Sequence, residues 1–161
     1  MTTQPAWDDG LLQRLRDLYE PLRRFAGVVG RLDVEPDDLV QEAYTRFLSA
    51  DRGTIDDLGS YLRRSIVNIA TNERRRLRRA SAAQHRLDRD KGAFDAYPSG
   101  LGDLMRLDAR DRALLYLVDI EGHPIANAAI TVNLAAPAAR MALSRARKAL
   151  RTTIAMESNN E

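Results

Sequence analysis

The apolar side chains near the N-terminus repeat with the period of an α-helix. Six of them follow one another at alternating spacings of four and three residues: Leu11, Leu15, Leu18, Leu22, Phe25 and Val29. This spacing places them on one face and predicts an amphipathic helix. Asp8 or Asp9 can cap the start of this helix, and Gly30 can end it. Because Pro21 lies inside the pattern, we expect a kink or a break near Glu20.

Two more helices are expected in the N-terminal half. Pro36 suits the first turn of one of them, and Asp37 and Asp38 then lie at the positive end of its dipole. The next helix begins near Asp57 with an apolar stripe that fades after Ala70, where arginines follow. A helix that changes from amphipathic to uniformly charged leaves its own core. Its tail must therefore be solvated or bind another molecule.

The C-terminal half contains the pattern of a helix-turn-helix. A helix over residues 108–120, ended by Gly122, is followed by a short helix over 124–131, a tight turn, and a long basic helix over 136–152. Two helices joined by a turn of about three residues, the second one basic, are typical of this DNA-binding motif.

These patterns together predict an all-α fold of two small helical modules. The first spans residues 8–79 and the second 106–153, with a flexible linker over 80–105 that has some helix at its start and a disordered tail over 154–161. Scarce glycine, proline and aromatic residues argue against an all-β sandwich.

The residue types needed for a metal site or a nucleophile are missing or badly spaced. The 161-residue chain has no cysteine, and His85 and His123 are not at metal-ligand spacing. We therefore expect no catalytic residue, no metal and no cofactor. The polar, acidic start does not resemble a signal peptide, and no apolar run approaches the roughly 20 residues of a membrane span. These features predict a cytoplasmic protein that does not insert into membranes.

The charged residues are separated along the chain although the formal net charge is only +2. Acidic residues dominate between positions 31 and 57, whereas arginines dominate over 61–79 and basic residues over 140–151. Such a layout favours one polyanionic partner and a separate protein partner.

Three stretches resemble the extracytoplasmic-function group of bacterial sigma factors, within the sigma-70-like superfamily. They are DLVQEAYTRFL at 38–48, YLRRSIVNIATNERRR at 61–76, and LDARDRA at 107–113, followed by Glu121-Gly122 and by LSRARKAL at 143–150. The resemblance implies a region 2-like bundle and a region 4-like helix-turn-helix. It also implies a transcription-initiation role in which the protein binds core RNA polymerase, recognises promoter DNA and melts it.

The same resemblance implies three groups of site residues. The group expected to dock on the polymerase clamp is Asp38, Gln41, Glu42, Arg46 and Phe47. The group expected at the downstream element and the melted strand is Asp51, Arg63, Arg64, Asn68, Asn72, Arg74, Arg75 and Arg76. The group expected on the upstream element is Ala138, Arg140, Arg145, Arg147 and Lys148. The implied partners are the clamp and flap of core polymerase, double- and single-stranded promoter DNA, and an anti-sigma factor.

The chain departs from the family pattern at several positions. Asn133 replaces the usual turn glycine and tolerates the left-handed conformation. Ala135 replaces the usual capping hydroxyl. Alanines also stand where the family presents polar side chains to the major groove, at Ala136, Ala138 and Ala142. Asp51 stands where family members often have an aromatic residue. The alanines predict few direct base contacts by the C-terminal helix. Asp51 would lie near the melted strand and bears on the preferred downstream sequence.

The sequence is also compatible with other interpretations of these motifs. An ordinary solvated face would also account for the acidic helix, a surface asparagine for Asn68, and a solvated helix end for the arginine run. A sigma-like decoy that sequesters an anti-sigma factor would explain the alanine-rich helix. A helix-turn-helix regulator would leave the motif at 38–48 unexplained.

Overall fold

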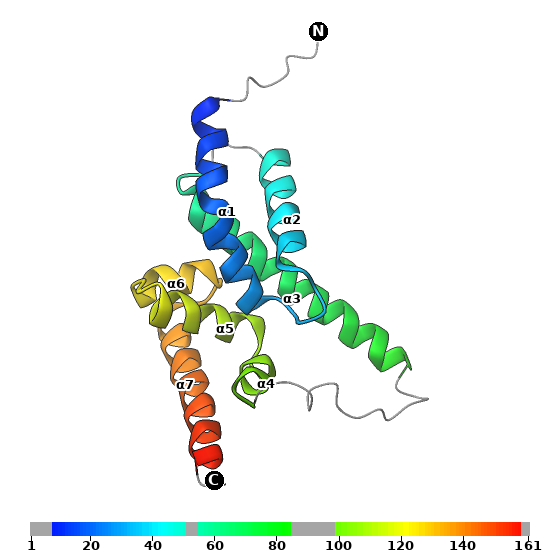
Figure 1. Ribbon diagram of the computed structural model, residues 1–161, viewed down its shortest axis with the longest axis vertical. Coiled ribbons are helices and arrows are strands. Elements are labelled where there is room, and N and C mark those ends of the chain that lie inside the picture. Colours follow the sequence, from blue (N-terminus) through cyan, green and yellow to red (C-terminus); the bar gives the residue numbers. More distant parts are fainter. Residues whose placement is uncertain (1–7, 51–54, 85–98, 159–161) are drawn as a thin grey trace.

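The computed structural model describes residues 8–50, 55–84 and 99–158, and these residues contain no strand (Figure 1). The elements are α1 (Asp9–Val29), α2 (Pro36–Ser49), α3 (Leu58–Gln84), α4 (Ser99–Arg106), α5 (Ala109–Leu115), the π-helical turn η2 (Tyr116–Ile120), α6 (Ile125–Thr131) and α7 (Ala136–Ser158). The predicted all-α fold is therefore confirmed. Asp51 lies outside the described residues.

The first helix begins and ends at the predicted residues. The Asp8 carboxylate accepts a hydrogen bond from the backbone N–H of Gly10 at 3.1 Å, and Gly30 follows the last turn. The predicted break is wrong, because α1 continues through Pro21. Proline removes one backbone donor, but Leu22 and Phe25 directly beyond it are fully buried and hold the next turn in place. Gly30 is needed for packing, since an added Cβ would lie 2.7 Å from a methyl carbon of Leu39.

The N-terminal module consists of α1, α2 and α3, which pack around large side chains. Its fully buried members include Leu22, Phe25, Val29, Val40, Leu62 and Ile66. Pro36 opens α2 as expected, and the Asp57 carboxylate accepts hydrogen bonds from the Gly59 N–H and the Ser60 hydroxyl at the start of α3. These bonds lower the pKa of Asp57, so the carboxylate caps the helix in its charged form.

The C-terminal module consists of α4 to α7 and differs from the predicted boundaries at both ends. The helix α4 begins at Ser99, inside the stretch expected to be linker, whereas the end of α3 at Gln84 agrees with the helix expected at the start of that stretch. At the other end α7 continues to Ser158, past the expected end at residue 153. The predicted turn before α7 is confirmed, because Asn133 has a left-handed backbone with φ of 57°.

The two modules pack against each other and share one hydrophobic core. Helices α5 and α6 contact α3, and α5 also contacts α1. The rings of Phe25 and Tyr116 meet edge to face across this boundary, with 5.7 Å between their centroids. Figure 1 shows α5 and α6 against the middle of the N-terminal bundle, while the arginine-rich end of α3 extends away from it.

Candidate nucleic-acid interface

One face of α3 is polar and open to solvent along the length of the helix. Arg64, Asn68, Asn72, Arg75 and Arg79 follow one another at spacings of four or three residues, and all are exposed. The opposite face, with Leu62, Ile66 and Ile69, lies in the core. Two amides therefore lie between guanidinium groups along a single surface, which we call the α3 stripe. Amides can pair with base edges and guanidiniums with phosphates.

Arg63 is turned away from this stripe and pairs with the C-terminal module. Its Nη2 lies 3.0 Å from a carboxylate oxygen of Glu121, and only 14% of the Arg63 side chain is exposed. The same carboxylate lies 3.0 Å from Nε2 of His123. Arg63 was expected to face promoter DNA. In this arrangement it is occupied by a contact that joins the two modules.

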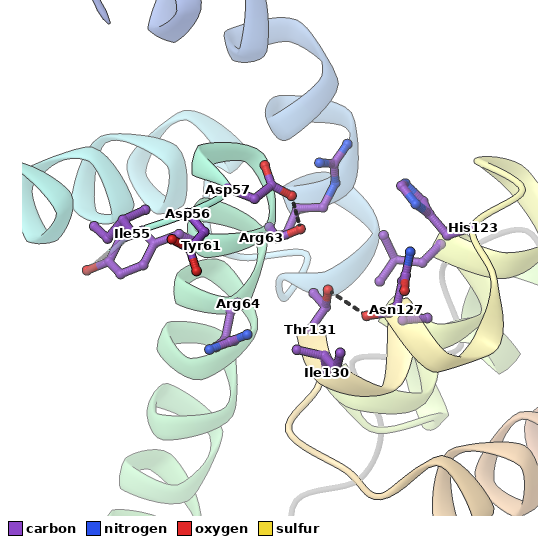
Figure 2. Close-up of a pocket in the computed structure, with 13 residues that line it drawn as sticks. Ile55, Asp56, Asp57, Tyr61, Arg63, Arg64, His123, Asn127, Ile130 and Thr131 are labelled. Carbon is purple, nitrogen blue, oxygen red and sulfur yellow. Dashed lines mark hydrogen bonds between the residues drawn. The ribbon is translucent and has the colours of Figure 1, made fainter. Parts of the chain in front are cut away.

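A cavity of about 660 Å³ opens beside the start of the α3 stripe (Figure 2). Arg64 from α3 faces it, opposite Ile130 and Thr131 from α6. Asp56, Asp57 and Arg63 line it as well. The cavity therefore has both cationic and acidic lining residues and lies between the modules.

The arginine run at the end of α3 divides between two environments. Arg75 and Arg76 are exposed, whereas Arg74 is half-buried. Arg74, Arg75 and Arg78 face Arg110 across a second, smaller cavity at the module boundary. The run is therefore helical to its end, and part of it belongs to the contact between modules.

The predicted polymerase-docking residues on α2 divide by burial. Asp38, Gln41, Glu42 and Arg46 are exposed, and Arg46 forms an ion pair with Glu42 one turn away. Phe47 is 3% exposed and packs edge to face against Tyr61 at 5.8 Å between centroids. A direct contact between Phe47 and a partner is therefore not available in this conformation. Its role here is to hold α2 against α3.

The basic helix α7 presents fewer free groups than its sequence suggested. Ala138, Arg140, Arg145 and Lys148 are exposed. Arg147 is held by both oxygens of Asp119, which raises the pKa of its guanidinium.

The expectation that Ala142 faces the groove of DNA is wrong. Ala142 is 3% exposed and lies in the core of the C-terminal module with Ala139 and Ala146. It is three residues after Ala139 and four before Ala146, the spacing of one helix face. The sequence therefore did carry the signal that places Ala142 inside.

Sequence reasoning missed the role of Arg112, which is 4% exposed. Its Nε donates to the carbonyl of Val28 at 2.8 Å, and its Nη2 donates to the carbonyls of Val29 at 2.6 Å and Gly30 at 3.3 Å. These carbonyls lie at the C-terminal end of α1, where backbone acceptors lack partners in the helix and a cation is favoured. Burial, and then the nearby charge of Arg74, lowers the pKa of Arg112 to about 10, so it stays charged at neutral pH.

The described residues contain no cluster of histidine or acidic side chains that could hold a metal ion. Among the helices of the described part of the chain, none combines the length and the apolar character that crossing a bilayer requires.

Comparison with known proteins agrees with this geometry. Residues 104–150 match the family described as sigma-70, region 4. The C-terminal module is therefore similar in sequence to sigma-70 region 4. The fold as a whole is similar to that of the sigma factor RpoE from Bartonella quintana, solved in complex with the anti-sigma factor NepR.

The similarity to RpoE extends over nearly the whole chain, with a TM-score of 0.74 and 20% sequence identity. It covers 91% of this chain and 98% of that one. No curated protein sequence matches the chain. The resemblance to extracytoplasmic-function sigma factors that the three motifs predicted is thus confirmed for the region 4 module by sequence and for the whole chain by fold.

Proposed function

We propose that the protein is an alternative sigma factor that binds core RNA polymerase and directs promoter recognition and strand separation. The observation that carries the proposal is the α3 stripe, where two exposed amides lie between exposed guanidiniums on a fold similar to that of a sigma factor. Arginines neutralise phosphates, whereas an asparagine can donate to and accept from a base edge at the same time. In this proposal the polymerase carries out the chemistry, and the chain contributes binding energy and position.

The stripe suits strand separation because it combines a base-reading group with a cationic surround. Moving a base out of the duplex costs a few kcal/mol, which contacts to the displaced base and its phosphates must offset. Asn68 lies one turn from Arg64 and one turn from Asn72. We assign Asn68 to the displaced base and Arg64, Arg75 and Arg79 to the strand backbone.

The acidic face of α2 is the proposed contact with polymerase. Asp38, Gln41 and Glu42 are exposed on neighbouring turns, where they can accept charge-assisted hydrogen bonds from a basic partner. The region 4 module is the proposed contact with upstream DNA, through Arg140, Arg145 and Lys148. An anti-sigma factor is a further proposed partner, because the similar RpoE was solved with one.

The test is run-off transcription with purified core polymerase and candidate promoters. We expect a promoter-dependent product that requires the full chain, and Asn68→Ala should lower its yield while leaving binding to core polymerase unchanged. Failure of the wild-type chain to give a product from any candidate promoter, under conditions in which another sigma factor initiates, would overturn the proposal.

A second candidate is a decoy that binds an anti-sigma factor without initiating transcription. The first turns of α7 favour it, because Ala138 and Met141 are exposed there and offer no hydrogen bonds to bases. Gel filtration separates the two candidates. A sigma factor should elute with core polymerase, whereas a decoy should elute only with the anti-sigma factor.

A further inference from the structure

The smaller cavity at the module boundary has a volume of about 220 Å³ and is lined mostly by arginine. Its α3 side consists of Thr71, Arg74, Arg75 and Arg78, and its α5 side of Asp108, Ala109 and Arg110. Both modules therefore contribute guanidinium groups to one partly open cavity.

The charges around this cavity are not balanced. Four guanidiniums face one carboxylate, a net charge of +3. That carboxylate, on Asp108, already accepts a hydrogen bond from the backbone N–H of Asp111 at 2.9 Å. Within the described residues none of the four arginines takes part in an ion pair or a hydrogen bond. Like charges held this close repel one another, and the charge of Arg74 reaches the buried Arg112 as well.

One of the residues that line the cavity, Thr71, carries an unsatisfied hydroxyl. The Oγ1 atom of Thr71 is buried and has no hydrogen-bond partner in the described part of the chain. Most buried hydroxyls are paired, and each exception needs an explanation. An anion that brings acceptor oxygens into the cavity would both neutralise the arginines and accept a hydrogen bond from Thr71.

We propose that this cavity binds the phosphate group of a small phosphoanion and that the bound group fastens the two modules together. The planar guanidinium matches phosphate oxygens in a two-point contact, which makes arginine the preferred residue for such sites. Because Arg75 also belongs to the α3 stripe proposed for promoter DNA, a bound phosphoanion and a DNA strand would compete. The site itself does not depend on the proposed function, and its test needs neither polymerase nor promoter.

The test is calorimetric titration of the full chain with inorganic pyrophosphate at fixed ionic strength. We expect binding to the wild type and an affinity at least about tenfold lower for both Arg78→Gln and Arg110→Gln, one from each module. The matched control is Arg16→Gln, which removes the same charge from an exposed position on α1. Absence of binding, or equal weakening by all three variants, would overturn the site. Weakening by Arg78→Gln alone would overturn the bridge between modules.

A second variant keeps the test decisive if an arginine variant fails to fold. Thr71→Val preserves the shape of the side chain and removes only the hydroxyl, so it should weaken pyrophosphate binding without lowering the free energy of unfolding. Unchanged binding would remove Thr71 from the site.

The source of the phosphate is tested by a parallel titration with a short single-stranded oligonucleotide. If Arg110→Gln weakens oligonucleotide binding while pyrophosphate does not bind to any form, the cavity serves DNA alone and the proposal fails.

Discussion

The two modules fill their cores with side chains of different size. Leu22, Phe25, Leu62 and Ile66 are fully buried between α1, α2 and α3. In the C-terminal module the buried faces of α5, α6 and α7 consist largely of alanine: Ala109, Ala113, Ala128, Ala129, Ala139, Ala142 and Ala146. Alanines let helices approach closely but bury little apolar area, and burial stabilises by about 25 cal/mol per Å². The second module should therefore depend on the first.

The module boundary is consistent with this dependence. Tyr116, Arg112 and Glu121 of the C-terminal module each contact the N-terminal one. The two modules also differ in what they expose, since α3 presents amides where α7 presents Ala138 and Met141. Five predictions test these differences, in order of decreasing size.

Removing the largest buried ring should have the largest effect. Phe25→Ala should lower the free energy of unfolding by about 4 kcal/mol, because it leaves a cavity in the first core and removes the contact with Tyr116. Urea denaturation measures this loss, and Leu32→Ala, at an exposed position, is the control. A loss below about 2 kcal/mol would mean that the first core is not the main source of stability.

Replacing the buried cation should uncouple the modules. Arg112→Met leaves the carbonyls at the end of α1 without their donor and should cost about 3 kcal/mol. Arg112→Lys keeps the charge and should cost less. If the second module depends on this contact, the single denaturation transition should split into two for Arg112→Met. An unchanged single transition at wild-type stability would contradict the dependence.

Enlarging an alanine should show how tightly the second core is packed. Ala139→Leu should cost about 2 kcal/mol, because the residue is fully buried between close helices. Its neighbour Ala138 is exposed, so Ala138→Leu is a matched control and should change stability by less than about 0.5 kcal/mol. Equal effects from the two substitutions would indicate a loosely packed module.

The α3 stripe should separate base reading from phosphate binding. Arg75→Gln should lower the slope of log affinity for promoter DNA against log salt concentration by about 0.9. Asn68→Ala should leave that slope nearly unchanged and lower the rate of promoter opening by about tenfold, measured by permanganate reactivity of unpaired thymines. If both variants altered only the slope, Asn68 would lose its assigned role.

The smallest effect concerns a polar link inside the first module. The Tyr44 hydroxyl donates to the carbonyl of Leu15 at 2.6 Å, so Tyr44→Phe should cost about 1 kcal/mol at pH 8. Burial, and then the charge of Tyr19, raises the pKa of Tyr44 to about 12. Because the neutral phenol is favoured in the folded state, Tyr44 contributes its full stabilisation of the fold below pH 10. This contribution is lost as the pH rises from 10 to 12.

This pH dependence is checked by denaturation of both proteins at pH 8 and pH 11. The free energy of unfolding of the wild type should exceed that of Tyr44→Phe by less at pH 11 than at pH 8. A difference between the two proteins that stays constant with pH would show that Tyr44 does not titrate with the fold.

The helices were predictable because apolar periodicity and capping are local. The alternating spacing from Leu11 to Val29 gave α1, and Pro36 gave the start of α2. The break at Pro21 was wrong because local propensity gave way to the buried side chains beyond it.

The contact between modules was not predictable, because it depends on how helices distant in sequence approach one another. Arg112 looked like one more surface arginine, and nothing in its neighbours indicates that it reaches carbonyls more than eighty residues earlier. For the same reason the pairing of Arg63 with Glu121 was not predictable, and the assignment of Arg63 to DNA stays a prediction. The face of Ala142, in contrast, could have been predicted from its spacing to Ala139 and Ala146.

The continuity of α3 has a mechanical consequence. Its 27 residues extend over about 40 Å without a break. One half is clamped by the first core, and the other half carries the arginines. Because the helix is continuous, a force on the arginines should tilt the whole first module instead of bending α3 locally. A molecule that binds the arginines should therefore also change the position of the acidic face of α2.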